Sequence, residues 1–354
     1  MSIPPMPQPP SQSSSSPSSS SSPSLRRKIT LLDGAQIPWL GWGNGSGDAK
    51  KTALESGSEA LRVGIRHIDT AQNYRNEANT GEVIAKSGVG KEAIWVTSKI
   101  SERPPPPDSK GTENVPVPLT EVRASIDESL TKLGFIPDLF LIHNPYVAED
   151  QDVSLKKLWQ ILEDLKDEGK LRSIGVSNFR PQDLKVVLEG ARHKPVVNQL
   201  EYHPYVLAHL EPVLAIQKEH GIVTEAYGPL TPAIRHPTGG PLQPILMRIA
   251  QRLNKDNASL IKASSAVDPG FISAPFDPSA VLLLWVRAMG VVAVTASGNK
   301  GRIRRLAEIS YLPEGLLNPE EVQEISDVGK TVHWRYYTEH MEKDFPLPEL
   351  PTGL

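Results

Sequence analysis

Short apolar runs alternate with longer stretches of helical periodicity from about residue 28 onward. The runs are rich in β-branched residues and predict strands, whereas the longer stretches predict amphipathic helices. The predicted strands are 39–43, 65–69, 94–98, 138–143, 171–176, 196–200, 222–226 and 291–295. The predicted helices are 50–63, 77–87, 119–133, 154–168, 181–191, 209–220, 242–253 and 300–310. Each strand is thus followed by a helix.

Strict alternation of strands and helices implies a parallel sheet with right-handed crossovers. Eight such units in about 250 to 320 residues have the expected size of a closed barrel. An open doubly wound sheet is the alternative, and it favours a G-x-G-x-x-G turn after the first strand. Gly41, Gly43, Gly45 and Gly47 supply that spacing in no register. The sequence therefore predicts an α/β fold, a (β/α)8 TIM barrel, over residues 27–354.

Both ends of the chain depart from this alternation. Residues 29–37 predict a β-hairpin that turns at Asp33-Gly34, and Pro38 should end its second strand. Residues 1–26 form a Ser/Pro-rich tail with too few apolar residues to offset the entropy of ordering, so we expect disorder. The tail faintly resembles a transit peptide, but its prolines oppose the amphipathic helix that such a peptide needs.

Three connections are too long for simple turns, namely 101–118, 229–241 and 264–278. The first two follow predicted strands, so we expect them to wall a pocket at the carboxyl ends of the barrel. We expect the third to be a surface insertion. The aromatic-rich tail 333–354 should either cross the mouth of the pocket or pack against the outer barrel wall.

The chain has 38 Lys and Arg against 41 Asp and Glu, a net charge of −3, which argues against a nucleic-acid partner. It has no Cys, which excludes disulfides, thiolate metal sites and a cysteine nucleophile. The longest apolar run, 280–286, is far too short to span a membrane. These features indicate a soluble intracellular protein, and we expect it to be a cytoplasmic monomer that binds a small molecule and no metal.

Polar residues stand where most of the predicted strands end: Asp69, Lys99, His143, Ser177 with Asn178, Gln199, Tyr227 and Ser297. Any one of them has an ordinary explanation as a turn former or helix cap. In a barrel, however, all of them lie at one rim, where a Lys and an Asp require each other as partners. This arrangement predicts a functional site.

Tyr74 follows Asp69 by five residues and brings a phenol to the same rim. The unperturbed pKa of a phenol is about 10, and a cationic Lys99 nearby would lower it. Asp69 would orient Lys99, and His143 could donate a hydrogen bond to a substrate oxygen. No nucleophile–base pair or metal-ligating cluster is apparent. The set therefore favours reduction of a carbonyl by hydride from a bound nicotinamide.

Four ordered blocks resemble the signature segments of the aldo-keto reductase superfamily: GIRHIDTAQNYRNE at 64–77, LIHNP at 141–145, GKLRSIGVSNF at 169–179 and VNQLEYHPY at 197–205. The resemblance runs from about residue 28 to 340. Residues 144–147, 294–297 and 333–337 are most similar to fungal α-keto amide and conjugated polyketone reductases.

This resemblance implies a catalytic tetrad of Asp69, Tyr74, Lys99 and His143, with Tyr74 as the general acid. It implies an NADPH site in which Ser177, Asn178 and Gln199 bind the nicotinamide carboxamide and Tyr227 stacks on the nicotinamide ring. The other implied contacts are Leu230 to the pyrophosphate and Ser297 and Arg302 to the 2′-phosphate.

The sequence also departs from the family pattern. The lysine of the motif after the last strand is Ala296 here, and Lys300 is the candidate replacement for its charge. Arg305 stands where a residue near the adenine is expected and could reinforce phosphate binding. Asn144 replaces a tryptophan after the histidine, which should enlarge and polarise the pocket, as a dicarbonyl or amide-bearing substrate requires.

The leading hypothesis is an NADP-dependent oxidoreductase that uses NADPH to reduce a ketone or aldehyde, such as an α-dicarbonyl, α-keto ester or α-keto amide, to the alcohol. One alternative is an NADPH-binding sensor or interaction subunit on the same fold, which the intact tetrad disfavours. Another is a barrel lyase that uses Lys99 as a Schiff-base nucleophile.

Overall fold

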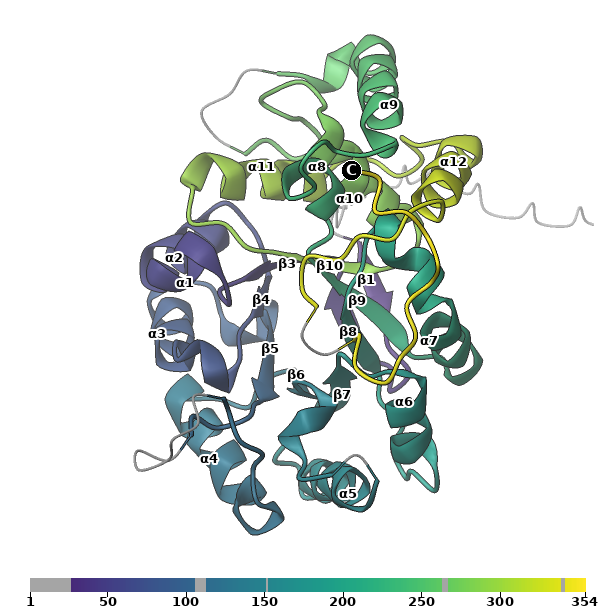
Figure 1. Cartoon of the computed structure of the whole chain (residues 1–354). Coiled ribbons are helices and arrows are strands. Elements are labelled where there is room, and N and C mark those ends of the chain that lie inside the picture. The colour runs from purple at the N-terminus through teal and green to yellow at the C-terminus, as the bar shows by residue number, and fades with distance from the viewer. Residues whose placement is uncertain (1–26, 106–112, 151, 263–266, 339–340) are drawn as a thin grey trace, which may run out of the picture.

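The computed structural model describes residues 27–105, 113–150, 152–262, 267–338 and 341–354. Within them, eight parallel strands close a barrel in the order β10-β3-β4-β5-β6-β7-β8-β9 (Figure 1). The predicted (β/α)8 barrel is therefore confirmed. The predicted tail 1–26 lies outside the described residues.

Each barrel strand overlaps its predicted counterpart. The strands are β3 (Leu40–Gly43), β4 (His67–Asp69), β5 (Trp95–Ile100), β6 (Leu139–Ile142), β7 (Ser173–Ser177), β8 (Val197–Glu201), β9 (Val223–Tyr227) and β10 (Val292–Thr295). Most of their residues are buried, because helices cover the outside of the barrel and side chains fill the inside. Strand β5 extends beyond its predicted end at residue 98, so Lys99 lies within the strand.

The helices that correspond to the eight predicted ones are α2 (Ala53–Arg62), α3 (Glu77–Lys86), α4 (Val122–Leu133), α5 (Val153–Asp167), α6 (Pro181–Leu188), α7 (Leu207–His220), α9 (Leu242–Asp256) and α11 (Lys300–Ser310). Two short helices, α1 (Gly47–Lys51) and α8 (Thr231–Ile234), lie in loops at the carboxyl ends of β3 and β9. Single 3-10 turns are η1 (Gln72–Tyr74), η2 (Lys91–Ala93), η3 (Leu119–Glu121), η4 (Pro145–Val147), η5 (Pro204–Val206) and η6 (Ala258–Leu260).

The sequence prediction missed two helices, α10 (Pro278–Ala288) and α12 (Pro319–Gly329). Helix α10 packs against β10, and α9 packs outside it against α10 and α12, so assigning 242–253 to the barrel wall was wrong. Residues 280–287 of α10 are all buried. A helix that is apolar on every side shows no amphipathic period, which is why the pattern did not reveal it.

The predicted hairpin is confirmed and closes one mouth of the barrel. Strands β1 (Lys28–Thr30) and β2 (Gln36–Pro38) pair antiparallel, and the turn places Gly34 at φ 85°, a conformation that favours glycine. The hairpin packs against residues at or near the starts of the barrel strands; this cluster is Leu31, Ile37, Leu139, Leu141, Val196, Val197 and Val292. The carboxyl ends of the strands are left for the site.

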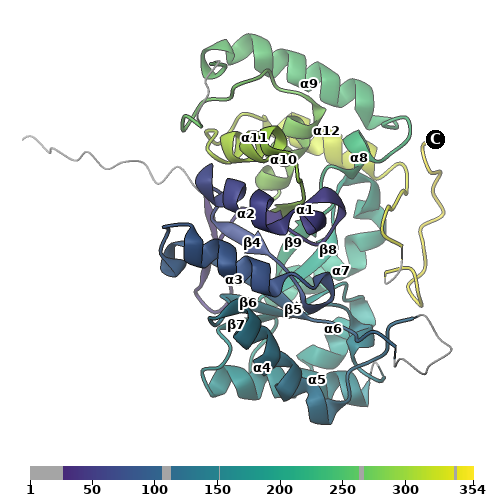
Figure 2. The same ribbon diagram turned by 90° about the vertical axis from the view of Figure 1, so that its left-hand side faces the viewer.

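The C-terminal segment after α12 lies on the same side of the barrel as α8 (Figure 2). Its first part is tied to the barrel, since the Trp334 amide donates to the Tyr205 carbonyl at 3.1 Å. Its middle part packs against α6 and α7: the Gln182 amide donates to the Asp344 carbonyl at 2.9 Å, and Phe345 stacks on His209 with ring centroids 4.1 Å apart. Its last residues return to the start of the segment, where the His333 amide donates to the Pro351 carbonyl at 2.8 Å. Both expected placements of the tail therefore occur, one after the other along the segment.

The segment 264–278 is more than a surface insertion. Its described part, from residue 267, carries Ile272 and Phe276, which are buried in the main core. Residues 263–266 lie outside the described part of the chain. The expected surface insertion is therefore anchored by two apolar side chains, which dock the connection between α9 and α10 against the protein.

Gly81 lies where α3 packs tightly against the end of α4. A Cβ atom there would lie 2.4 Å from the Leu133 carbonyl oxygen, a backbone atom that cannot rotate away. We expect Gly81→Ala to lower the free energy of unfolding by about 1 to 3 kcal/mol through overpacking. In the control Gly301→Ala, the added Cβ meets only the Asn299 side chain, at 3.2 Å, so the change should stay within about 0.5 kcal/mol. Equal stability of the two variants in urea denaturation would contradict this account.

Candidate active site

A cavity of about 370 Å³ opens at the carboxyl ends of the barrel strands. The predicted site residues that line it are Asp69, Tyr74, His143, Ser177, Asn178, Gln199, Tyr227 and Leu230. Four predicted residues do not line the cavity. Lys99 is fully buried on β5. The other three, Ser297, Lys300 and Arg302, come just after Ala296, which is itself a lining residue. The barrel thus gathers the predicted residues around one concave space.

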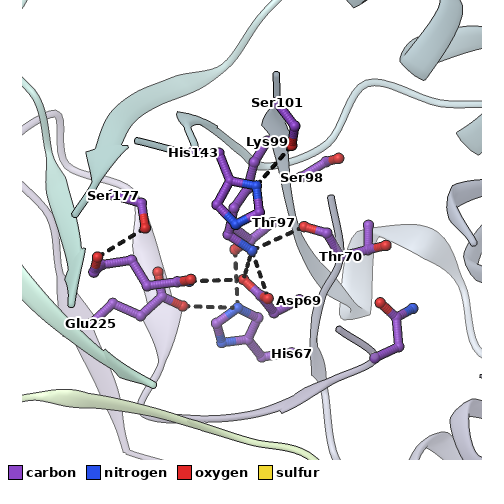
Figure 3. A network of polar contacts seen from close by, with 12 residues as sticks. His67, Asp69, Thr70, Thr97, Ser98, Lys99, Ser101, His143, Ser177 and Glu225 are labelled. Atoms are coloured by element: carbon purple, nitrogen blue, oxygen red, sulfur yellow. Dashed lines mark hydrogen bonds and ion pairs between the residues drawn. The ribbon is translucent and has the colours of Figure 1, made fainter. Parts of the chain in front are cut away.

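Strands β4 and β5 lie side by side and bring Asp69 and Lys99 together (Figure 3). The Lys99 amine donates to the two Asp69 carboxylate oxygens at 2.7 and 2.8 Å and to the Thr70 carbonyl at 3.0 Å. Burial alone would favour the neutral amine, but Asp69 outweighs it and raises the pKa of Lys99 above its usual value. The structure therefore holds a buried, fixed positive charge at the floor of the cavity.

Tyr74 ends η1, just after β4, and the Lys99 amine lies 5.1 Å from the centre of its ring. Gly45 makes room for that ring, since a Cβ there would lie 2.4 Å from the Tyr74 Cζ. Burial raises the pKa of Tyr74, and the Lys99 charge opposes the increase. Lys99 thus acts on the pKa of the phenol in the expected direction, but burial, which the sequence-based expectation left out, outweighs it in the protein alone.

His143 follows β6 and lies edge-on to Tyr74, with ring centroids 5.5 Å apart and planes at 79°. The His143 Nδ1 lies 2.7 Å from the Ser101 hydroxyl, and the Asn178 side-chain amide donates to the His143 carbonyl at 3.0 Å. These contacts fix the imidazole beside the phenol. Ser101 was not predicted, because nothing in its spacing separates it from an ordinary loop serine.

Amide and hydroxyl groups line the wall next to the tetrad. The Tyr227 hydroxyl donates to the Asn178 side-chain oxygen at 2.7 Å, and the Ser177 hydroxyl donates to the Gln199 carbonyl at 2.9 Å. Asn178 adopts a left-handed φ of 58°, which asparagine tolerates better than most residues. The Gln199 amide donates to Asp69 at 2.8 Å and so joins this wall to the charged pair.

A second polar group lies where β10 leads into α11. The Arg302 guanidinium donates to the Ser297 hydroxyl at 3.2 Å, and Asn299 caps the helix by accepting from the Arg302 amide at 3.0 Å. Lys300 and Arg302 are exposed. The first turn of a helix with an arginine and a hydroxyl suits a phosphate group.

Two interpretations of individual residues are wrong. The Arg305 guanidinium donates to the Ala274 and Pro275 carbonyls at 2.8 and 2.6 Å, so it holds the connection before α10 rather than a phosphate. Asn144 does not line the cavity; it caps η4 by accepting from the Tyr146 amide at 2.8 Å. The polar side chain of Asn144 is engaged in this local turn, so it does not make the cavity more polar.

The long connections contribute unequally to the cavity. Residues of the 229–241 segment line it, as predicted: Pro229, Leu230, Thr231, Ile234 and Arg235. The described residues of the 101–118 segment do not line it, which contradicts the expectation for that loop, and 106–112 lie outside the described part.

Glu201, the last residue of β8, anchors the C-terminal segment at the cavity. Its buried carboxylate accepts from the Arg335 guanidinium at 3.2 Å and from the backbone amides of Tyr336 and Tyr337 at 2.9 and 3.1 Å. Tyr337 thereby lines the cavity, edge-on to Tyr227 with ring centroids 5.3 Å apart. The sequence showed Glu201 inside a signature block and Tyr337 in an aromatic tail, with no sign that they meet.

Breaking this anchor should destabilise the protein. We expect Glu201→Gln to lower the free energy of unfolding by about 3 to 5 kcal/mol, because it leaves Arg335 buried without its charge partner. In the control Glu314→Gln, the altered side chain is 68% exposed and forms a surface ion pair with Arg27, so the change should lower the free energy of unfolding by only about 0 to 1 kcal/mol. Urea denaturation measures both, and similar losses in the two variants would refute the anchoring role of Glu201.

The described residues contain no cluster of three or more side chains that could hold a metal ion. No helix among them combines the length and the apolar character needed to cross a membrane. The donor set instead fits a dinucleotide: amides and hydroxyls for a carboxamide, the Tyr227 ring for a flat heteroaromatic ring, and Ser297 with Arg302 for a phosphate.

Comparisons with known proteins agree with this geometry. The sequence model described as Aldo/keto reductase family matches residues 40–330. The chain is 27% identical over 318 residues to the NAD/NADP-dependent indole-3-acetaldehyde reductase of Schizosaccharomyces pombe, covering 88% of this chain and 98% of that one. It is 30% identical over 273 residues to the NADPH-dependent alpha-keto amide reductase of Saccharomyces cerevisiae, covering 76% and 77%. The crystal structure of an aldo/keto reductase from Brucella melitensis has a similar fold, with a TM-score of 0.65, 28% identity and coverage of 86% and 99%.

Proposed function

The chain belongs to the aldo/keto reductase family, and on that basis we propose that it reduces a ketone or aldehyde to the alcohol with NADPH and with Tyr74 as the general acid. The observation that carries the proposal is the Lys99–Asp69 pair, whose amine lies 5.1 Å from the centre of the Tyr74 ring. A fixed cation beside a phenol stabilises the phenolate that remains after proton transfer.

NADPH, when bound, supplies the hydride that reduces the carbonyl carbon. The His143 imidazole and the Tyr74 hydroxyl, which lie next to each other, each donate a hydrogen bond to the carbonyl oxygen of the substrate. As negative charge develops on that oxygen, the O–H bond of Tyr74 breaks and its proton passes to the oxygen, completing the alcohol. Lys99 stabilises the resulting phenolate, and Asp69 keeps Lys99 charged and in place.

The cofactor side of the proposal uses both polar groups of the site. Ser177, Asn178 and Gln199 would hold the carboxamide, and Tyr227 would stack on the nicotinamide ring. Toward the other end of the cofactor, Leu230 would contact the pyrophosphate. The 2′-phosphate would be bound by Ser297, Lys300 and Arg302. The exposed arginine and lysine at the start of α11 support NADPH over NADH.

We propose substrates with a second oxygen beside the carbonyl, such as α-dicarbonyls, α-keto esters and α-keto amides. Other polar side chains that line the cavity, Ser46 and Arg235 among them, can bind such an oxygen. The name of the yeast relative, an alpha-keto amide reductase, supports this class.

The direct test of the reaction is Tyr74→Phe. Turnover should fall about 10²- to 10⁴-fold because the proton donor is lost, while NADPH affinity stays unchanged. Turnover is followed as NADPH oxidation with aldehydes, α-diketones, α-keto esters and α-keto amides, and affinity by quenching of protein fluorescence. The control Tyr336→Phe removes the same hydroxyl from a residue that does not line the cavity. Near-normal turnover of Tyr74→Phe would exclude the assignment.

The same assay separates the alternatives. A wild-type chain that binds NADPH but reduces no member of the panel would favour a sensor or interaction subunit. Borohydride trapping of a substrate adduct on Lys99 would favour Schiff-base chemistry.

Ala296 tests cofactor preference. Ala296→Lys restores the charge that the family places before Ser297, and it should tighten NADPH binding roughly tenfold through one charge-assisted contact while leaving NADH binding unchanged. The control Ala296→Met adds similar length without charge. Dissociation constants for both cofactors at low ionic strength measure the effect, and equal tightening of NADPH and NADH would contradict a 2′-phosphate site here.

A further inference from the structure

A second polar pair lies inside the barrel beneath Lys99 and Asp69. Glu225 on β9 and His67 on β4 are both fully buried, and the His67 Nε2 lies 3.5 Å from a Glu225 carboxylate oxygen across the barrel (Figure 3). Neither carboxylate oxygen of Glu225 accepts a hydrogen bond of good geometry from a described residue, and the Gln199 side chain is the one neighbouring donor that favours its ionised form through hydrogen bonding. The proposed mechanism uses neither side chain, so the pair needs its own explanation.

A carboxylate buried without donors is too costly to stay ionised when a neighbour can accept its proton. The Lys99 amine already serves both Asp69 oxygens, and the Gln199 amide donates to Asp69 at 2.8 Å. Burial raises the pKa of Glu225 to about 8; Asp69 acts in the same direction, whereas Lys99 and hydrogen bonding from Gln199 act against it. Glu225 therefore carries a proton at neutral pH.

His67 is suited to accept that proton in a hydrogen bond. Burial lowers the pKa of His67 to about 4, so its ring is neutral. A neutral imidazole carries one proton, and we place it on Nδ1, where the Pro38 carbonyl is the neighbouring acceptor although the two make no hydrogen bond of good geometry. Nε2 is then an acceptor, facing Glu225 and, at 3.0 Å, the Thr97 hydroxyl.

We propose that Glu225 is a positioning residue whose proton, shared with His67, keeps a single negative charge next to Lys99 and thereby sets how readily Tyr74 donates its proton. This inference rests on the proposed function. The titratable groups that face Glu225 are His67 and Asp69 on β4 and Lys99 on β5, and Gln199 on β8 is its uncharged polar neighbour.

Loss of the Glu225 proton changes the charge balance around Lys99. Two buried carboxylates then face one amine, and their combined negative charge makes the Tyr74 phenol hold its proton more tightly. Proton transfer to the substrate oxygen slows as a result. Reduction should therefore weaken as pH rises through the range in which Glu225 ionises.

The test compares the pH profile of kcat for wild type and Glu225→Gln with saturating NADPH and carbonyl substrate. Glutamine mimics the protonated acid, so the two should have equal kcat at pH 6. Between pH 7 and 9 the kcat of wild type should fall roughly threefold to tenfold, whereas the profile of Glu225→Gln should show no such inflection. The control Glu308→Gln, another buried glutamate outside the cavity, should keep the wild-type profile. An unchanged inflection in Glu225→Gln, or a loss of turnover at every pH, would overturn the proposal.

A second readout does not depend on catalysis. An acid whose pKa is higher in the folded than in the unfolded chain destabilises the fold as pH rises from its unfolded pKa to its folded one. Urea denaturation should therefore show Glu225→Gln gaining stability relative to wild type between about pH 4.5 and 8. If no carbonyl is reduced, the proposed function fails, but the stability measurement still tests whether Glu225 is protonated in the folded protein. A parallel pH dependence of the two chains would show that Glu225 is not protonated and would refute the inference.

Discussion

The buried ion pair between Lys99 and Asp69 is the interaction on which the site depends. Neither charge could stay inside the barrel alone, because desolvation costs several kcal/mol for each ion. Their strands lie side by side in the sheet, and the amine meets both carboxylate oxygens within 2.8 Å. The pair also contacts its surroundings: the Lys99 amine lies 5.1 Å from the centre of the Tyr74 ring, and the Gln199 amide donates to Asp69 at 2.8 Å. The neutral Glu225 that we propose follows from the same pair, because the Lys99 amine already serves Asp69.

The rest of the architecture keeps this charge at the floor of one open cavity. The β1–β2 hairpin closes the opposite mouth of the barrel. Glu201 uses a separate set of hydrogen bonds to bring Tyr337 to the cavity, close to Tyr227. The buried cation and the aromatic wall suit the proton donation and the binding of a flat cofactor ring that we propose.

Much of this could be predicted from the sequence, because strand ends in a parallel barrel all reach one rim. That rule located Asp69, His143 and Tyr227 without any knowledge of side-chain contacts. It failed where long-range packing decides the outcome. Helix α10 is apolar on all sides and shows no period, and the direction of Arg305 depends on a connection thirty residues away. The pKa of Tyr74 depends on burial, which the sequence does not state. Glu225 is an acid within a predicted barrel strand, where both faces are buried, and this is a sequence signal for a special role.

The central claim is that Lys99 acts on the reaction through the Tyr74 phenol. A double-mutant cycle on hydride transfer tests it most directly, with Tyr74→Phe, Lys99→Met and the double variant compared in single-turnover reduction by bound NADPH. If Lys99 serves the phenol, its replacement does no further harm once the hydroxyl is gone, so the double variant is as slow as Tyr74→Phe alone. If the double variant is instead slowed by the product of the two single-variant rate reductions, Lys99 acts independently of Tyr74, which would contradict the account.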